Sequence, residues 1–556
     1  MAFMALFASS GPSEGAAPFR FLDASDETGL EFTHFNGMVG ALYFSEMMGS
    51  GAALLDYDRD GDLDLYLVQG SSLAGSPEAA DGKATPGDRL LRADWATEEG
   101  APTLLWVDVS ESSGVTGLGD GMGVATADYD GDGWTDLFVT QLGPDQLLRN
   151  RGDGSFEDVT EAAGVGDPRW AVAATFADVD RDGRLDLYVG NYVNFRAATH
   201  KQCVSTTGVE DYCGPLAYEP EADVLYRNLG DGRFEDISRR SGVESRPGGA
   251  LGVVAFDADG DGWVDFYVAN DQVPNKLWRN DGTGSFVDDA LIGGVGVNEA
   301  GQPEASMGLA LGDLTGDGTA DLFVSHLSRE TNTLYSQVGD GFFEDSTRGS
   351  GLDSLSFAFT GFGVAAVDVD FDGRLDLFVA NGAVKRQEDQ VRAGDPHPLR
   401  QTNQAFRNLG RGRFVEATAE VGSPLARADV SRGVAAGDID NDGRTDLVVT
   451  NNAGPAQLLL NRTDSSLPWS GIAPASLGAG WLGTRVVVES SASGVGSAGS
   501  SGWMSTDGSY ASASDARVVL ALPEDDGTRL RLSFPDGARR ILVAPPLRRY
   551  LNLEAR

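Results

Sequence analysis

The sequence predicts an all-β fold: a seven-bladed β-propeller followed by a small β domain. Three observations lead to this prediction. An acidic loop with one spacing of aspartates returns seven times along the chain. Each copy lies between a strand of small residues and a strand of β-branched or aromatic residues. A second hairpin, marked by Gly-x-Gly-x-Phe, follows most copies, so one repeat contains the four strands of a propeller blade.

Charge and length limit the classes of function. The chain has 556 residues, with 84 acidic side chains against 42 basic ones, and a formal charge of −42. Nucleic acids and anionic membrane surfaces are disfavoured as partners because both require basic patches. There is no apolar run long enough to cross a bilayer, so no transmembrane segment is expected. We expect a monomer, with residues 1–19 as a leader or signal remnant and a linker.

The repeated loop has the frame Asp-x-Asp-x-Asp-Gly-x-x-Asp, and we number its copies loops 1 to 7. At positions 1, 3, 5, 7 and 9 the copies contain Asp56, Asp58, Asp60, Asp62 and Asp64; Asp128, Asp130, Asp132, Trp134 and Asp136; Asp178, Asp180, Asp182, Arg184 and Asp186; Asp257, Asp259, Asp261, Trp263 and Asp265; Asp313, Thr315, Asp317, Thr319 and Asp321; Asp368, Asp370, Asp372, Arg374 and Asp376; and Asp438, Asp440, Asp442, Arg444 and Asp446.

This spacing predicts up to seven calcium sites. Calcium takes six to eight oxygen ligands at about 2.3–2.6 Å, and alternate residues of a tight turn can converge on one ion. We therefore expect the carboxylates at positions 1, 3, 5 and 9 and the carbonyl of position 7 to be ligands. The glycine at position 6 permits the turn. Magnesium or manganese is less suited, because small octahedral ions keep more water.

Two other interpretations of the loops fit less well. Aspartate as an ordinary turn former explains one Asp-Gly per loop, but not four acids at constant offsets. An EF-hand begins with the same residues but requires a bidentate Glu at position 12 and flanking helices. Position 12 is apolar in every copy: Leu67, Val139, Val189, Val268, Val324, Val379 and Val449. The loops are therefore predicted to join strands.

The strands around each loop place it in the propeller. Five residues before position 1, six copies have Gly and the third has Ala173, which suits strands crowded around a central axis. After loop 7 no Phe-x-Asp strand follows, whereas the chain start contains Phe21-Leu-Asp23. We therefore expect residues near 20–30 to supply the outer strand of the last blade, which removes an exposed edge. The propeller is predicted over 20–463.

Insertions and a C-terminal segment complete the organisation. Residues 71–103 and 383–403 are predicted surface loops, and 464–556 a separate β-rich module. The insertion 191–222 contains Cys203 and Cys213, the two cysteines of the chain. Their spacing fits a disulfide that clamps this insertion, and two free thiols are the alternative. A disulfide would favour an oxidising compartment.

At this point the chain resembles a known family. Its Asp-x-Asp-x-Asp-Gly-x-x-Asp units resemble FG-GAP/VCBS repeats, the blades of the integrin α head. Gly480–Val488, Gly508–Ser512 and Phe534–Gly537 resemble an ASPIC/UnbV domain. The pairing is similar to the cartilage acidic protein family and its bacterial members. The resemblance implies a secreted, periplasmic or cell-surface calcium-binding propeller for adhesion or interaction, without established catalytic residues.

Two functions are compatible with these features. The first is a calcium-stabilised interaction module for a protein or glycan partner. The alternative is a propeller-type polysaccharide lyase or hydrolase, which needs an acid–base constellation in a cleft. The insertion offers Tyr192, His200, Lys201 and Tyr212 for such a role.

Overall fold

The computed structural model describes residues 17–73, 75, 85–98, 101–115, 117, 119–205, 208–465, 467–490, 500–522 and 527–553. Most of the expected leader, residues 1–16, lies outside this set. Seven antiparallel four-stranded sheets follow one another along the chain, and we number them sheets 1 to 7.

Each of sheets 1 to 6 is built from strands that follow one another in the sequence, whereas sheet 7 takes one strand from the chain start. Sheets 1 to 3 contain β2 (Ala52–Leu55), β3 (Asp64–Leu67), β4 (Arg89–Glu98) and β5 (Ala101–Asp108); β6 (Gly121–Ala127), β7 (Asp136–Gln141), β8 (Gln146–Asn150) and β9 (Phe156–Asp158); and β10 (Ala171–Ala177), β11 (Asp186–Asn191), β14 (Val224–Asn228) and β15 (Phe234–Asp236). Sheets 4 to 7 contain β16 (Ala250–Phe256), β17 (Asp265–Asn270), β18 (Lys276–Asn280) and β19 (Phe286–Asp288); β20 (Leu309–Gly312), β21 (Asp321–Val324), β22 (Thr333–Gly339) and β23 (Phe342–Asp345); β24 (Gly361–Val367), β25 (Asp376–Asn381), β27 (Gln404–Asn408) and β28 (Phe414–Glu416); and β30 (Ser431–Gly437), β31 (Asp446–Asn451), β32 (Gln457–Asn461) and β1 (Phe21–Asp23).

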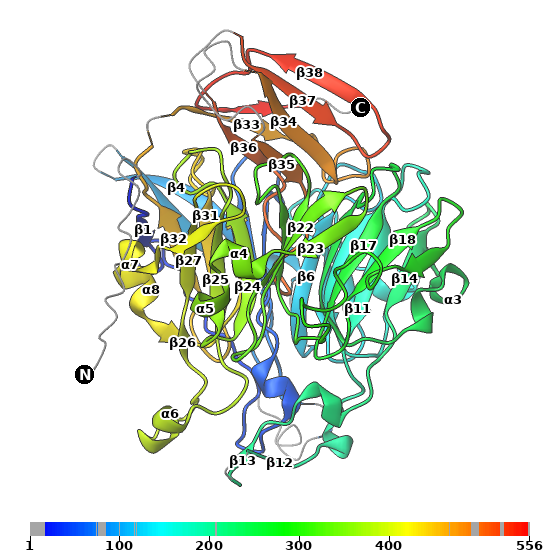
Figure 1. The fold of residues 1–556 in the computed structure, drawn as a ribbon, viewed down its shortest axis with the longest axis vertical. Coiled ribbons are helices and arrows are strands. Elements are labelled where there is room, and N and C mark those ends of the chain that lie inside the picture. The colour runs from blue at the N-terminus through cyan, green and yellow to red at the C-terminus, as the bar shows by residue number, and fades with distance from the viewer. Residues whose placement is uncertain are drawn as a thin grey trace, which may run out of the picture.

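The seven sheets form a ring, which Figure 1 shows from the side. Their first strands contact one another in cyclic order, from β2 through β6, β10, β16, β20, β24 and β30 back to β2. At the last position β1 pairs antiparallel with β32, with Leu22 opposite Leu460, as the Phe-x-Asp pattern predicts. The all-β propeller architecture is therefore confirmed, and the outer strand of sheet 7 comes from the chain start.

Close approach requires small residues immediately before some of the first strands. A Cβ atom added at Gly308 would lie 1.9 Å from the carbonyl oxygen of Phe362, on the next sheet. One added at Gly51 would lie 2.0 Å from the carbonyl oxygen of Ala511. Any larger residue would therefore force neighbouring backbones apart.

The C-terminal segment forms two further sheets above the ring (Figure 1). One contains β33 (Trp469–Ala473), β36 (Val518–Ala521) and β39 (Tyr550–Asn552), and the other β34 (Thr484–Ser490), β35 (Ser501–Met504), β37 (Arg529–Ser533) and β38 (Arg539–Val543). Their shared apolar core includes Trp481, Val486 and Leu532.

Residues 505–515, between β35 and β36, leave these sheets and enter the ring; we call them the plug. The plug makes hydrogen bonds with the first strand of all seven sheets: Ala513 N to Ala52 O (2.9 Å), Val124 N to Ala511 O (3.2 Å), Thr175 Oγ1 to Asp507 Oδ2 (2.8 Å), Ala255 N to Asp507 Oδ2 (2.9 Å), Leu309 N to Ser509 O (3.0 Å), Val364 N to Ser509 Oγ (3.3 Å) and Asp515 N to Ala436 O (2.9 Å). The sequence predicts a separate module, whereas the structure places part of it inside the propeller.

Two predicted surface loops contain regular structure. Within 71–103, β4 is the third strand of sheet 1, and its Leu90 and Leu91 are buried. The prediction of a loop there was wrong because this copy has no Gly-x-Gly-x-Phe turn to mark the hairpin. The segment 383–403 contains α6 (Glu388–Arg392) and β26 (Gln401–Thr402), which pairs with β29 (Ala428–Asp429).

In the described residues the helices are short and lie in the connections between strands. They are α1 (Ser110–Ser113), α2 (Thr160–Ala163), α3 (Ser238–Ser241), α4 (Thr347–Ser350), α5 (Asp353–Ser356), α7 (Thr418–Val421), α8 (Ser423–Ala426) and the 3₁₀ turns η1 (Phe44–Met47), η3 (Ala197–Thr199), η4 (Pro215–Ala217) and η5 (Val243–Ser245). Within the described ranges, every helix is too short or too polar to cross a bilayer.

Candidate metal sites

Each acidic loop joins the first and second strands of its sheet, as the sequence predicts. The glycine at position 6 has φ between 84° and 96° in all seven copies, the left-handed region that favours glycine. Its N–H donates to the carboxylate at position 1, for example from Gly443 to Asp438 Oδ2 at 2.8 Å. The loop conformation is therefore stabilised by the same carboxylates that could bind a cation.

The carboxylate at position 5 caps the turn. In every loop its Oδ1 accepts the N–H of position 7, as between Asp60 and Asp62 at 2.9 Å. Position 5 thus has a structural partner that the sequence analysis did not assign.

The aspartate at position 9 is buried and joins two strands. Asp136, for example, accepts the N–H of Tyr129 at 3.2 Å with Oδ2 and that of Asn150 at 2.8 Å with Oδ1. All seven copies repeat this arrangement. Position 9 therefore attaches the loop to the third strand of its sheet, besides facing the other carboxylates.

Positions 1, 3 and 9 gather as a divalent cation requires. In loops 1, 2, 3, 4 and 6, one oxygen from each of these three carboxylates lies within 4.8 Å of the others. Several position-1 and position-3 oxygens, in these loops and in loop 7, are buried and have no hydrogen-bond partner among the described residues: Asp56 Oδ1, Asp128 Oδ1, Asp180 Oδ1, Asp370 Oδ1 and Asp440 Oδ1. Buried oxygens of this kind are costly unless an ion or another donor satisfies them. The residues present therefore fit a hard divalent cation.

The electrostatics of the loops favour the same cation. Burial, followed by neighbouring carboxylates, raises the pKa of Asp64 to about 8 and that of Asp56 to about 6, against the hydrogen bonds that each accepts. Burial likewise raises the pKa of Asp186 and Asp265 to about 7. A bound cation would favour the ionised forms and offset this cost.

The loops differ in their basic neighbours. In loops 3, 4, 6 and 7 an arginine from the third strand, or just after it, forms an ion pair with the position-3 carboxylate, as Arg227 does with Asp180 at 2.6 Å and Arg462 with Asp440 at 2.6 Å. Loops 1, 2 and 5 have no recorded ion pair at positions 1, 3, 5 or 9 in the described chain. In these three loops a bound cation would therefore have less competition from basic side chains.

Loop 5 is the least acidic copy, because Thr315 replaces the position-3 aspartate. Its Asp321 accepts N–H groups from Leu314, Thr315 and Gln337 at 2.8–3.0 Å. This loop keeps the backbone geometry of the others with one negative charge fewer.

At six of the seven junctions, an asparagine or glutamine in the third strand links a loop to the next sheet. Asn150 Nδ2 in sheet 2 donates to Tyr57 O in loop 1 at 2.8 Å. We call this contact the latch. It recurs from Asn228 to Tyr129, Asn280 to Val179, Gln337 to Ala258, Asn408 to Leu314 and Asn461 to Val369, at 2.7–3.1 Å. The repeated asparagine was visible in the sequence, but its partner in the preceding repeat was not.

The C-terminal sheets lie against the loop face of the ring. Their contacts reach loops 2, 5, 6 and 7: Tyr550 Oη to Asp438 Oδ2 (2.6 Å), Arg517 Nη2 to Asp438 O (2.7 Å), Arg485 Nη2 to Gly318 O (2.8 Å), Ser500 Oγ to Gly373 O (3.0 Å) and Asp128 N to Leu477 O (3.2 Å). Position 1 of loop 7 therefore already has a phenolic partner.

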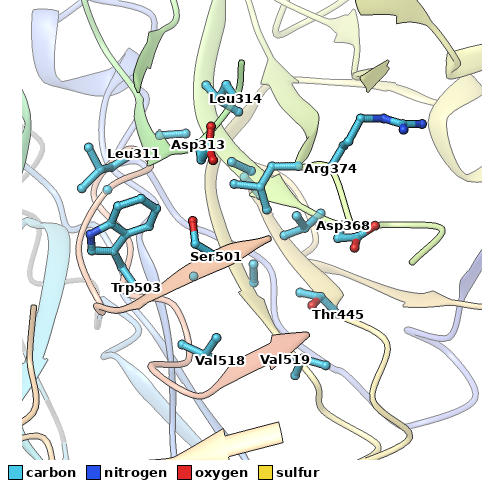
Figure 2. Close-up of a pocket in the computed structure, with 18 of the residues that line it drawn as sticks. Leu311, Asp313, Leu314, Asp368, Arg374, Thr445, Ser501, Trp503, Val518 and Val519 are labelled. Carbon is cyan, nitrogen blue, oxygen red and sulfur yellow. The ribbon is translucent and has the colours of Figure 1, made fainter. Parts of the chain in front are cut away.

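A cavity of about 460 Å³ remains between the loop face and the C-terminal sheets. Figure 2 shows Trp503 and Ser501 of β35 on one side, with Leu311, Asp313 and Leu314 on another and Asp368 across from them. The position-1 aspartates of loops 5, 6 and 7 line this cavity. The acidic loops and the C-terminal segment therefore share one interface.

The four candidate enzyme residues each have a partner in the structure. The hydroxyls of Tyr192 and Tyr212 are buried and donate to Asp271 and to Glu46, the latter at 3.0 Å. His200 packs edge-on against Tyr43, and Lys201 lies over the ring of Tyr218. These contacts attach the insertion to neighbouring segments.

The insertion 191–222 is clamped as predicted, by a disulfide between Cys203 and Cys213. Beside it, β12 (Cys203–Val204) pairs with β13 (Glu210–Asp211) at the end of the ring opposite the C-terminal sheets (Figure 1). Asp211 Oδ1 accepts the N–H of Arg386, and Lys385 donates to the carbonyl of Tyr212. Three segments distant in sequence, around residues 46, 212 and 386, thus converge on this face.

Comparison with known proteins agrees with this architecture. The family model described as "FG-GAP-like repeat" matches residues 128–189, 216–268, 257–324, 313–379 and 391–449. Cartilage acidic protein 1 of Homo sapiens is 25% identical over 375 residues, which cover 64% of this chain and 50% of that protein. The Xenopus tropicalis protein of the same name is 27% identical over 308 residues, covering 51% and 40%. The chain thus spans about half the length of these relatives.

Among solved structures, YCF48 bound to D1 peptide is 8% identical with a TM-score of 0.39, covering 81% of this chain and 99% of that one. At this TM-score the likeness supports no inference about function.

Proposed function

Because the chain belongs to the FG-GAP-like repeat proteins, we propose that it is a calcium-binding β-propeller that acts outside the cytosol as an interaction module. Its ligand is a protein or a glycan. The proposal rests chiefly on the loops, where carboxylates at positions 1, 3 and 9 converge and leave buried oxygens without partners.

Calcium suits these loops better than a smaller ion, because several carboxylates and a carbonyl are offered to each ion. We assign positions 1, 3 and 9 as ligands in each loop, with positions 5 and 7 completing the set where the turn allows. Seven divalent ions would neutralise one third of the formal charge of −42. Folding and calcium binding should therefore be coupled. Loop 5, with Thr315, should bind calcium most weakly.

Two further features support a role outside the cytosol. The Cys203–Cys213 disulfide is typical of an oxidising compartment. The clamped insertion and the segments around it form a face opposite the calcium loops. This face is therefore available for a partner. The relatives named cartilage acidic protein 1 are consistent with an extracellular structural role.

Calcium titration followed by calorimetry tests the metal assignment. Chelation should lower the melting temperature by roughly 10 °C or more, and added calcium but not magnesium should restore it. Replacing Asp58→Asn and Asp130→Asn should remove two binding equivalents, because both keep the shape of the side chain and lose its charge. The matched control is Asp153→Asn, in an exposed hairpin turn. A melting temperature insensitive to chelation would refute the proposal.

The interaction role is tested by capture from the extracellular fraction of the native cells, with calcium and after chelation. A glycan panel should show retention without new reducing ends or unsaturated products. Release of such products would favour the polysaccharide-cleaving alternative.

A further inference from the structure

The outer rim of the ring carries an apolar surface at the junction of sheets 4 and 5. We call it the rim patch. It consists of Val287 on β19, Leu291 and Ile292 in the turn that follows β19, and Val338 and Phe342 at the β22–β23 hairpin. Their exposed fractions are 61%, 64%, 73%, 62% and 53%. The turn and the hairpin are in contact, because Phe343 N donates to Gly293 O at 2.8 Å.

The repeats themselves provide a reference for this surface. Leu291 and Ile292 occupy the fifth and sixth positions after the anchoring phenylalanine. In the other repeats these two positions contain charged, polar or small residues: Asp26 and Glu27, Glu111 and Ser112, Glu161 and Ala162, Arg239 and Arg240, Arg348 and Gly349, and Ala419 and Glu420.

The same contrast holds in the hairpin of sheet 5. Phe342 stands where the other Gly-x-Gly turns have Ser155, Arg233, Ser285 or Arg413. Two adjacent elements thus carry large apolar side chains where the fold accepts polar ones. The apolar core does not require these residues, since more than half of the surface of each is exposed to solvent. Contiguous exposed apolar residues of this kind mark interaction sites.

Charge around the rim patch indicates the kind of partner. A crevice beside Leu291 is lined by Glu299, Glu344 and Asp345. The structure records one ion pair at these three carboxylates, between Arg348 and Glu299 at 3.4 Å. A surplus of negative charge therefore borders the apolar residues. A second copy of this chain, with its charge of −42, is disfavoured as the occupant.

We propose that the rim patch binds a protein segment that presents apolar side chains next to lysine or arginine. Apolar side chains of the partner would cover Leu291, Ile292 and Phe342, and its cations would pair with Glu344 and Asp345. Electrostatic complementarity would orient the partner, while apolar burial would provide most of the affinity. This surface is distinct from the calcium loops, so a negative result here leaves calcium binding unaffected.

A dye attached at the patch tests the proposal. Both native cysteines form the disulfide, so Ile292→Cys introduces a single reactive thiol for a polarity-sensitive fluorophore. The matched control is Leu216→Cys, an aliphatic residue 69% exposed in the clamped insertion. The probes are three synthetic peptides of equal length, built from leucine and lysine, from leucine and glutamate, or from serine and lysine.

The leucine–lysine peptide should shift the dye at position 292 and not at 216, with at least about tenfold higher affinity than the other two peptides. Unlabelled protein should compete, and unlabelled Leu291→Ser/Ile292→Ser should compete at least about tenfold less well. Unlabelled Leu216→Ser should compete like the original protein. Equal responses at both positions, equal binding of the leucine–glutamate peptide, or a dimer in sedimentation that Leu291→Ser/Ile292→Ser abolishes would each overturn the proposal.

Discussion

Neighbouring sheets meet in two different ways around the ring. At six junctions the latch joins an asparagine or glutamine of one sheet to the preceding loop, as between Asn150 and Tyr57 at 2.8 Å. At the seventh junction, between sheets 7 and 1, the latch position is Ala93, which has no side-chain amide. There Arg517 donates to Asp438 O at 2.7 Å and to Asn441 Oδ1 at 2.8 Å.

This difference shows that the repeat does not close the ring by itself. The seam between sheets 7 and 1 depends on segments outside the repeats, namely β1 from the chain start and the C-terminal sheets from its other end. Asn441 completes the seam by donating to Asp62 Oδ1 at 2.9 Å. The latched junctions form between consecutive repeats, whereas the seam joins regions separated by nearly the whole chain and has the larger entropy cost of closure.

The largest effect is expected from removing the N-terminal strand. Deleting residues 1–31 removes β1 and leaves β32 as an open edge, besides removing Phe19 and Leu30 from the core. The melting temperature should fall by roughly 10 °C or more. Deletion of 1–16 is the matched control and should leave the melting temperature unchanged. Equal melting temperatures for the two deletions would contradict a closing role for β1.

The second effect concerns Arg517 at the seam. Its side chain is 12% exposed and pairs with the 8% exposed Asp515 at 2.7 Å. Arg517→Met keeps most of the side-chain volume but leaves the buried carboxylate of Asp515 without its arginine partner. The free energy of unfolding should therefore fall by about 3 kcal/mol. Urea unfolding measures this change. If Arg517→Met lowers the free energy of unfolding by less than the latch variants Asn150→Ala and Asn408→Ala do, the seam does not depend on the C-terminal sheets.

Removing a latch should cost less. Asn150→Ala and Asn408→Ala each leave a buried loop carbonyl without its donor, with an expected loss of about 1–3 kcal/mol in the free energy of unfolding. Asp153→Asn, in the exposed hairpin beside Asn150, should change stability by less than about 0.5 kcal/mol. If Asn150→Ala and Asn408→Ala have the same free energy of unfolding as this control, the latch does not contribute to stability.

The smallest effect is expected from adding the missing latch. Ala93 N donates to Asp64 Oδ1 at 2.9 Å, as Asn150 N does to Asp136 at 2.8 Å, so the backbone at this position matches the others. Ala93→Asn should direct an amide toward Ile439 O and stabilise the protein by at most about 1 kcal/mol. A clear loss in urea unfolding would show that the apolar packing around Ala93 excludes the amide.

Much of the fold and the loop geometry was predictable because it is local. The spacing of aspartates around Gly61 or Gly443 implies a turn between strands, and φ values of 96° and 92° agree. Sheet 1 was harder to recognise, because Ala93 replaces the asparagine and no Gly-x-Gly turn follows β4. The second role of Asp136, as acceptor for the third strand of its own sheet, could not be read from its spacing to Asp128.

The sequence by itself determined the repeating unit: a small-residue strand, an acidic turn, an apolar strand and a second hairpin, because each depends on residues close together in the chain. The tertiary structure alone decided what joins these units. It brought Ala513 to Ala52 in the centre of the ring, Arg517 to Asp438 at the seam, and Asp211 to Arg386 on the opposite face. Such contacts depend on the curvature of the whole ring, and no local pattern encodes them.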